Sequence, residues 1–211
     1  MHLRLCAVIV LSLALCSLAA CRSQSGTPYP PGQALPDAER QALAAEAPSG
    51  AYVDPAYQFY AVYPGAAPTV SREQTRIGGD LWEVAVHESS VQTSSLKVSM
   101  IGRVPSSRPY EMTAEDANMM VTGMATTLLQ ALGPGATTVS QTLSTDADGV
   151  LTLEGTYRYA EGQFEARARI RAIAPGLCSA LAMYPADDNA RTRVANRFIE
   201  SVHCIGGQGG G

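Results

Sequence analysis

The sequence has little of what nucleic-acid-binding proteins and most hydrolases require. It has no excess of positive charge, since 15 lysine and arginine residues stand against 19 acidic residues, and this balance argues against a nucleic-acid partner. It contains only three histidines. It also lacks the G-x-S-x-G and H-E-x-x-H motifs, a phosphate-binding glycine loop and internal repeats. We therefore expect no cofactor, no metal site and no catalytic residue that a motif would identify.

Two patterns that could suggest catalysis have simpler structural interpretations. Ser94 and Lys97 form an S-x-x-K sequence, the spacing of nucleophile and lysine in serine β-lactamases and penicillin-binding proteins. The sequence around them alternates like a strand, which would point the two side chains to opposite faces. His87 and His203 have no second ligand at metal-binding spacing. We expect His87 to be an exposed strand residue and His203 to lie at the C-terminal end of a helix.

The N-terminal residues are typical of an export signal. Arg4 precedes an apolar run, Leu5–Leu18, which is too short to span a bilayer. The run ends in Leu18-Ala19-Ala20-Cys21, which resembles the lipobox of bacterial lipoproteins. The resemblance implies that residues 1–20 are a signal peptide and that Cys21 becomes the acylated first residue. Ordinary secretory cleavage is the alternative, but it prefers a small residue where Leu18 stands.

The lipoprotein resemblance also implies a location. A lipid on Cys21 would anchor the protein to a membrane of the cell envelope, facing the periplasm. Arg22, in place of Asp, follows the acylated cysteine. In Gram-negative lipoproteins this difference implies release to the outer membrane.

Composition divides the remaining chain into three parts. Residues 21–50 combine the acylated cysteine with a tether rich in Pro, Gly and Ala. Residues 51–205 carry the apolar patterns of a single globular domain. Residues 206–211 form a glycine-rich tail. We expect one folded domain held away from the membrane by its tether.

Two cysteines remain once the leader and the lipid-bearing residue are set aside, Cys178 and Cys204. In an exported protein such a pair is typical of a disulfide. The sequence between them predicts a strand, Leu177–Tyr184, and a helix, Asp187–His203. The strand would advance about 23 Å and the helix would return about 25 Å. The two cysteines should therefore meet at the same end of the domain.

Apolar periodicity predicts an α+β fold, an antiparallel sheet of about seven to eight strands with one inserted helix and one C-terminal helix. The inserted helix should begin at the capping-box sequence Thr113–Asp116, and Asp187 is the expected N-cap of the C-terminal helix. Leu177–Tyr184 has small or apolar residues on both faces, which places this strand inside the sheet. The other strands are expected over residues 57–63, 68–77, 81–88, 96–100 and 137–144 and in a hairpin over residues 149–172.

The hairpin has the best-defined register in the chain. A turn at Glu161-Gly162 would pair Tyr159 with Phe164, and every later cross-strand pair follows from it. The register predicts two opposite-charge pairs, Arg158 with Glu165 and Glu154 with Arg169. These pairs favour the proposed alignment because each sets a cation opposite an acid on the polar face.

The same register leaves Arg167 and Arg171 opposite threonines, without cross-strand acids. We expect both arginines to be exposed and unpaired, and therefore to be the residues that contact an anionic partner. The alternative is a solvated strand face with no binding role.

The domain also resembles the PsbP/Mog1-type domains of small bacterial lipoproteins. The residues that carry the resemblance are the opening strand and turn Phe59–Gly65, the hairpin, and the final strand and helix with Phe198 and Ile199. The resemblance implies an accessory or binding module and assigns no site residue. We expect a non-enzymatic envelope lipoprotein whose partner is an envelope protein or an anionic envelope polymer. The alternative is a periplasmic hydrolase that uses His87 or His203.

Overall fold

The computed structural model describes residues 41, 44–54, 59–77, 80–103, 112–145, 149–173 and 176–204. The expected signal peptide, the acylated Cys21, Arg22 and the tail at 206–211 lie outside these residues, as does most of the tether. Within the described ranges, no helix has the length and apolar character needed to cross a membrane.

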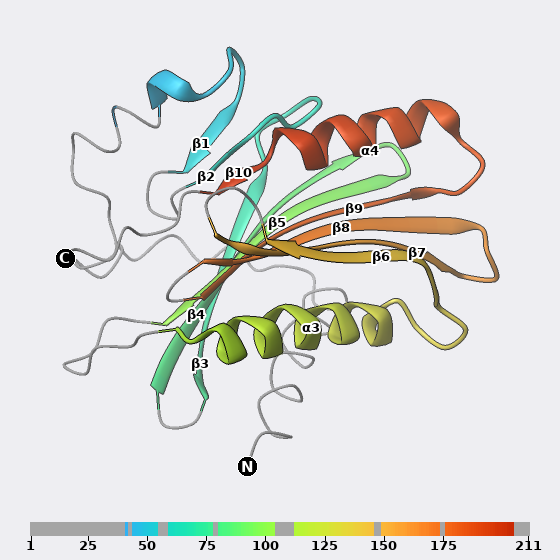
Figure 1. Cartoon of the computed structure of the whole chain (residues 1–211). Coiled ribbons are helices and arrows are strands. Elements are labelled where there is room, and N and C mark those ends of the chain that lie inside the picture. The colour runs from blue at the N-terminus through green and yellow to red at the C-terminus, as the bar shows by residue number, and fades with distance from the viewer. Residues whose placement is uncertain are drawn as a thin grey trace.

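Seven antiparallel strands form the main sheet, in the order β3-β4-β5-β9-β8-β7-β6 (Figure 1). The strands are β3 (Thr69–Ile77), β4 (Asp80–Val91), β5 (Ser94–Arg103), β6 (Thr137–Thr145), β7 (Leu151–Tyr159), β8 (Phe164–Ile173) and β9 (Gly176–Pro185). Strands that follow one another in the chain pair with one another, except where a helix is inserted between β5 and β6. After that insertion the chain returns from the far edge, β6, until β9 pairs with β5. The predicted α+β class is confirmed.

A second sheet of three short strands lies beside the first. It consists of β1 (Tyr52–Asp54), β2 (Phe59–Ala61) and β10 (His203–Cys204), with β2 in the middle. The sequence did not predict β1 or β10, because strands of three and two residues are too short to show an alternating pattern. The expected helix through His203 is wrong at its end, since the chain leaves the helix after Ser201 and pairs with β2.

Helix α3 (Ala114–Ala131) and helix α4 (Asn189–Ser201) cover opposite faces of the main sheet (Figure 1). Helix α3 packs on β7 and β8, and we call this side the α3 face. Helix α4 packs mainly on β9 and β8, and we call this side the α4 face. Because side chains alternate along each strand, one strand supplies residues to both layers of core.

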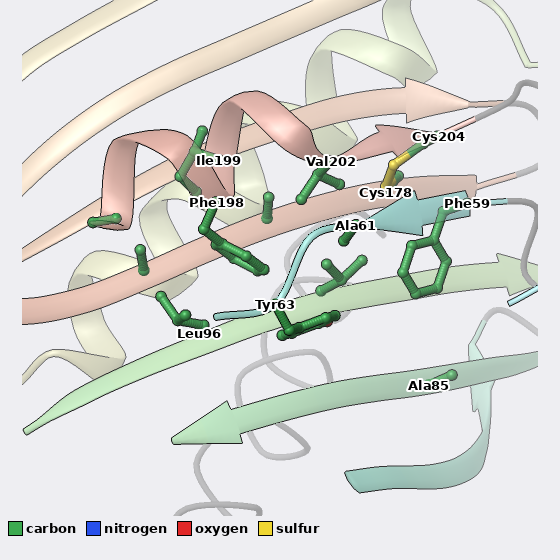
Figure 2. Close-up of a cluster of buried hydrophobic side chains, with 14 of the residues drawn as sticks. Phe59, Ala61, Tyr63, Ala85, Leu96, Cys178, Phe198, Ile199, Val202 and Cys204 are labelled. Carbon is green, nitrogen blue, oxygen red and sulfur yellow. A yellow bond between two sulfur atoms is a disulfide. The ribbon is translucent and has the colours of Figure 1, made fainter. Parts of the chain in front are cut away.

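Strand β9 lies in the middle of the main sheet and is buried on both faces, as its sequence predicts. On the α4 face, Ala180 and Ala182 are almost fully buried, in one cluster with Phe198 and Ile199 of α4. Small side chains on the strand let the helix approach closely, and Figure 2 shows Phe198 pointing from α4 toward the sheet.

The helix starts follow the local sequence closely. The predicted capping box of α3 is confirmed, because the Thr113 hydroxyl accepts from the backbone of Asp116 and the Asp116 carboxylate accepts from the backbone of Thr113. The predicted N-cap of α4 is wrong by one residue. Asp188, not Asp187, accepts hydrogen bonds from the backbone N–H groups of Ala190 and Arg191, at 2.9 and 3.0 Å. Either aspartate could supply the carboxylate, and the sequence alone does not distinguish them.

The predicted hairpin register is confirmed. Tyr159 pairs with Phe164, and Gln163 N donates to Ala160 O at 3.1 Å. Both predicted charged pairs form, Arg158 with Glu165 and Arg169 with Glu154. Backbone pairing and side-chain charge therefore select the same alignment.

Candidate functional site

Arg167 and Arg171 of β8 were expected to be exposed to solvent, but both contact other parts of the domain. Arg171 Nη1 donates to the carbonyl oxygen of Cys204 at 3.0 Å, and Arg167 Nη1 donates to Asn196 Oδ1. Both side chains are partly buried. The expectation of two exposed, unpaired arginines is therefore wrong. The expectation failed because α4 and β10 lie over this face of β8. The sequence of the hairpin does not show that other elements pack there.

Arg169, between them on the same face, links three elements. Its Nε donates to Glu154 Oε1 at 2.7 Å, and its Nη1 donates to the carbonyl oxygen of Ile199 at 3.1 Å. Ile199 belongs to the last turn of α4, where carbonyl groups lack partners within the helix. The guanidinium thus satisfies one such carbonyl and holds the end of α4 to β8.

A groove of about 520 Å³ opens beside Arg169 and Arg171, at the C-terminal end of α4, and Arg167 is not among the residues that line it. We call it the arginine groove. Its walls come from the α4 face of β6, β7 and β8 on one side and from the end of α4, β10 and β2 on the other. It is lined by Pro48, Tyr60, Ser144, Thr152, Glu154, Arg169, Arg171, Glu200, Ser201, Val202 and His203.

The arginine groove offers mixed chemistry. Arg169 and Arg171 bring positive charge, while Glu154 and Glu200 bring negative charge to the same walls. The rings of Tyr60 and His203 stack with centroids 5.0 Å apart and an interplanar angle of 19°. Such a flat aromatic surface beside charged and hydroxyl groups suits a polar ligand or a segment of another protein.

The groove does not contain an assembled nucleophile and base in the part of the chain that the structure describes. Ser201 Oγ donates to the carbonyl oxygen of Phe198 at 2.7 Å and accepts from the backbone N–H of Val62 at 3.0 Å. These two bonds hold the hydroxyl in a structural role. The ring of His203 has a stacking contact with Tyr60 but no recorded hydrogen bond to an acid or a hydroxyl among the described residues.

His87 lies elsewhere, and its environment contradicts the expectation of an exposed strand residue. Its exposed fraction is 0%. Nδ1 lies 3.3 Å from Tyr52 Oη, and Nε2 lies 3.4 Å from Asp54 Oδ2. Phe59 packs edge-on against the imidazole, with centroids 4.8 Å apart. Residues of β1 and β2 therefore cover His87, which we expected to be exposed to solvent.

Burial determines the protonation of this histidine. Loss of hydration, together with a smaller effect of the nearby Arg72, lowers the pKa of His87 to about 3. Burial, with Asp54 beside it, also raises the pKa of the Tyr52 hydroxyl well above its ordinary value. The site is thus a neutral imidazole between a carboxylate and a phenol. It has no exposed surface on which a substrate could contact the ring.

The residues around His87 were not found by sequence reasoning. Tyr52 and Asp54 lie 35 and 33 positions before it, on a strand that was not predicted. The weak sequence signal available was the aromatic character of residues 57–63, which predicted a strand but not its position over β4.

The S-x-x-K sequence is part of strand β5, as expected. Lys97 Nζ forms an ion pair with Glu88 Oε1 on the neighbouring strand at 3.2 Å. Ser94 is buried. Within the described residues there is also no group of three His, Cys, Asp or Glu side chains placed to hold a metal ion.

The cysteine pair is brought together as the strand and helix lengths predict. Cys178 and Cys204 lie at disulfide distance, with Cα atoms 6.4 Å apart and a sequence separation of 26 (Figure 2). Cys204 also supplies the carbonyl oxygen that Arg171 contacts. The pair therefore fixes β10 at the wall of the arginine groove.

No protein-family model matches this sequence, and no curated protein matches it significantly. The function must accordingly be argued from the residues and their arrangement.

Proposed function

We propose that this protein is a lipid-anchored envelope lipoprotein whose domain works by binding another envelope component in the arginine groove. The observation that carries the proposal is the groove itself, a surface hollow lined by residues of six strands and helices, with charges of both signs and a stacked aromatic pair. Cys21 would supply the anchor, and the domain would present the groove to the periplasm.

Binding accounts for the residues better than hydrolysis does. A general base must reach the proton it abstracts within about 3 Å, and His87 has no exposed surface. His203 does line the groove, but among the described residues no acid orients its ring and Ser201 is held by two other bonds. The resemblance to PsbP/Mog1-type domains also favours an accessory role.

The mixed charge of the groove favours a partner that carries polar groups of both kinds. Arg169 and Arg171 suit carboxylate or phosphate groups, whereas Glu154 and Glu200 would repel a uniformly anionic chain. An exposed segment of an envelope protein therefore fits the groove better than an anionic envelope polymer.

Site-specific crosslinking in living cells tests this proposal. A photoreactive phenylalanine analogue replaces Tyr60 in the groove, and in a matched strain it replaces Asn118, which is exposed on α3. We expect a discrete crosslinked product from position 60 and none from position 118. Equal crosslinking from both positions, or none from position 60, would contradict groove binding.

A charge reversal provides the second arm. Glu200→Arg changes an exposed carboxylate of the groove without removing a hydrogen bond that holds α4. Glu161→Arg makes the same change in the exposed hairpin turn, away from the groove. We expect Glu200→Arg to weaken crosslinking from position 60 and Glu161→Arg to leave it unchanged. A His203→Ala variant that loses a hydrolytic activity while keeping the crosslink would favour the enzyme alternative.

A further inference from the structure

One carboxylate of the arginine groove, that of Glu200, has no partner in the described part of the domain. Glu200 lies in the last turn of α4, where its side chain is exposed. Glu154, the other acid of the groove, differs from it because its carboxylate accepts from Arg169 Nε at 2.7 Å. The groove therefore presents an uncompensated negative charge at the end of α4.

The two arginines of the groove are engaged with oxygen atoms of the domain itself. Arg169 donates to Glu154 and to the carbonyl oxygen of Ile199. Arg171 donates to the carbonyl oxygen of Cys204. An acidic group of a partner would gain little by replacing these bonds, because it would first have to break them. The arginines can still contact a partner through their remaining N–H groups, but they do not supply an empty charge site.

The end of α4 adds to the negative potential of the groove. The last carbonyl groups of a helix lack partners within it and carry the negative end of the helix dipole, so a cation is favourable there. The last turn of α4 has no basic residue to fill this role. Helix α4 leads through Val202 directly into β10, so its end and the strand form one wall (Figure 1).

The stacked aromatic pair is a second feature that suits a cation. Tyr60 and His203 stack at 5.0 Å with an interplanar angle of 19°, and both line the groove together with Glu200. His203 follows Glu200 by three residues and is exposed. The face of a tyrosine ring attracts cations. A guanidinium group is flat, so it can stack on an aromatic surface while it donates two hydrogen bonds to a carboxylate.

We propose that the groove recognises an arginine side chain of its protein partner, with the guanidinium group stacked on the Tyr60–His203 pair and hydrogen-bonded to Glu200. This inference rests on the proposed function and names the residue type by which the partner's segment is recognised. A lysine would pair with the carboxylate but would not match the flat aromatic surface, because its ammonium group is a compact charge. The groove volume of about 520 Å³ is within the usual range for ligand sites.

Peptide titration followed by nuclear magnetic resonance tests the inference before the partner is known. The protein is the mature chain with Cys21→Ser, and the probe is a blocked five-residue peptide with arginine at its centre and glycine elsewhere. We expect the probe to shift the amide signals of Glu200 and His203, with a dissociation constant in the millimolar range. The signal of Asn118, exposed on α3, should not move. A matched peptide with citrulline, which keeps the shape of arginine without its charge, should bind about fivefold more weakly.

Charge removal identifies the carboxylate. Glu200→Gln keeps the size of the side chain and should weaken binding of the arginine peptide about fivefold, so that it no longer differs from the citrulline peptide. Glu161→Gln makes the same change in the exposed hairpin turn and should leave binding unchanged. Both side chains are exposed, so both variants should unfold at the same urea concentration as the parent.

Two substitutions of His203 test the aromatic surface separately. His203→Ala removes the ring and should weaken binding of the arginine peptide about threefold. His203→Phe keeps a flat ring beside Tyr60 and should retain the affinity of the parent. Equal losses in the two variants would overturn the stacking part of the proposal.

The outcomes separate this inference from the proposed function. Equal affinity for the arginine and citrulline peptides, or no shift of Glu200 and His203 by either, would overturn arginine recognition, whereas in-cell crosslinking from position 60 would still decide groove binding. If the crosslink forms, mass spectrometry should locate an arginine in the captured segment, and replacing it by glutamine in the partner should abolish the crosslink. A captured segment without such an arginine would overturn the inference and leave the proposed function standing. No crosslink from position 60 would contradict the proposed function and, with it, this inference.

Discussion

His87 Nε2 lies 3.4 Å from Asp54 Oδ2, and this contact ties strand β1 to strand β4 of the main sheet. The side chains of His87 and Asp54 are 0% and 8% exposed. Tyr52 completes the cluster, because its hydroxyl donates to Asp54 Oδ2 at 3.2 Å. A polar cluster in such a place is costly to disturb, since a buried polar group that loses its partner retains its desolvation penalty.

The first prediction is that acid destabilises the domain through His87. Its pKa is lowered from 6.5 to about 3 in the folded state, so the unfolded chain binds a proton that the folded chain does not. The stability contributed by the neutral ring is complete above about pH 6.5 and is lost as pH falls toward 3. One proton corresponds to a slope of at most about 1.4 kcal/mol per pH unit in the free energy of unfolding. Urea unfolding at a series of pH values measures this slope.

Two histidine variants separate this effect from the titration of carboxylates. His87→Asn should lower the free energy of unfolding near pH 7 and should also flatten its dependence on pH between 6 and 4. His203→Asn should keep the original slope, since His203 is exposed. Asp54, Arg72 and Tyr52 surround His87 and are retained in both variants. Equal slopes in the parent and in both variants would contradict the assignment.

The hairpin and the central strand could be predicted from sequence because local rules determine them. The turn at Glu161-Gly162 fixes one pairing and the strand period of two fixes all the others. Arg158 and Glu165 then test the alignment independently. In β9, the residues on both faces are apolar or small, which places the strand inside the sheet.

The layer that packs on the α4 face could not be predicted. Alternation along a strand separates its apolar face from its polar face, but it does not show which other elements cover either face. Glu83 and His87 look like solvent-facing residues of a strand, yet both are buried. His87 is covered by Tyr52 and Asp54 of β1 and by Phe59 of β2. Strand β2 pairs with β1 on one side and with the distant β10 on the other.

The expectation that Arg167 and Arg171 are exposed failed for the same reason, because the hairpin sequence does not show that α4 and β10 pack over them. The burial of these residues depends on packing with elements that are distant in the sequence. Two of the covering strands, β1 and β10, are too short to be recognised from the sequence.

The second prediction concerns Cys178 and Cys204. A closed loop with a sequence separation of 26 should stabilise the domain by about 3.5 kcal/mol in the chain-entropy model. The double variant Cys178→Ser and Cys204→Ser should therefore melt several degrees lower by calorimetry. Native protein should show neither thiol to an alkylating reagent. Labelling of both cysteines before reduction would contradict the bond.

The third prediction concerns the anchor, which lies outside the described residues. Cys21→Ser should abolish acyl labelling and move the protein from the membrane fraction to the soluble periplasmic fraction. Cys178→Ser is the matched control, because it removes a different cysteine and should keep the acyl label. A Cys21→Ser protein that still sediments with membranes would show that another segment holds it there.

The last prediction uses two glycines that face each other across β5 and β9, Gly102 and Gly176. A Cβ atom on Gly176 would lie 1.8 Å from the carbonyl oxygen of Ile101, whereas a Cβ atom on Gly102 would meet nothing within 4 Å. The obstructing atom belongs to the backbone, which cannot move aside as the end of a flexible side chain can. Gly176→Ala must therefore displace β9 relative to β5.

We expect Gly176→Ala to lower the free energy of unfolding by about 2 kcal/mol or more, and Gly102→Ala to change it by less than about 0.5 kcal/mol. Denaturant unfolding at neutral pH measures both values under the same conditions. The two substitutions are chemically identical and sit at paired positions, so a difference between them reports only the space around each residue. Equal losses would contradict this explanation, because neither glycine has a positive φ that would strain an alanine at both positions. A larger loss at Gly102 would contradict the close approach of β9 to Ile101.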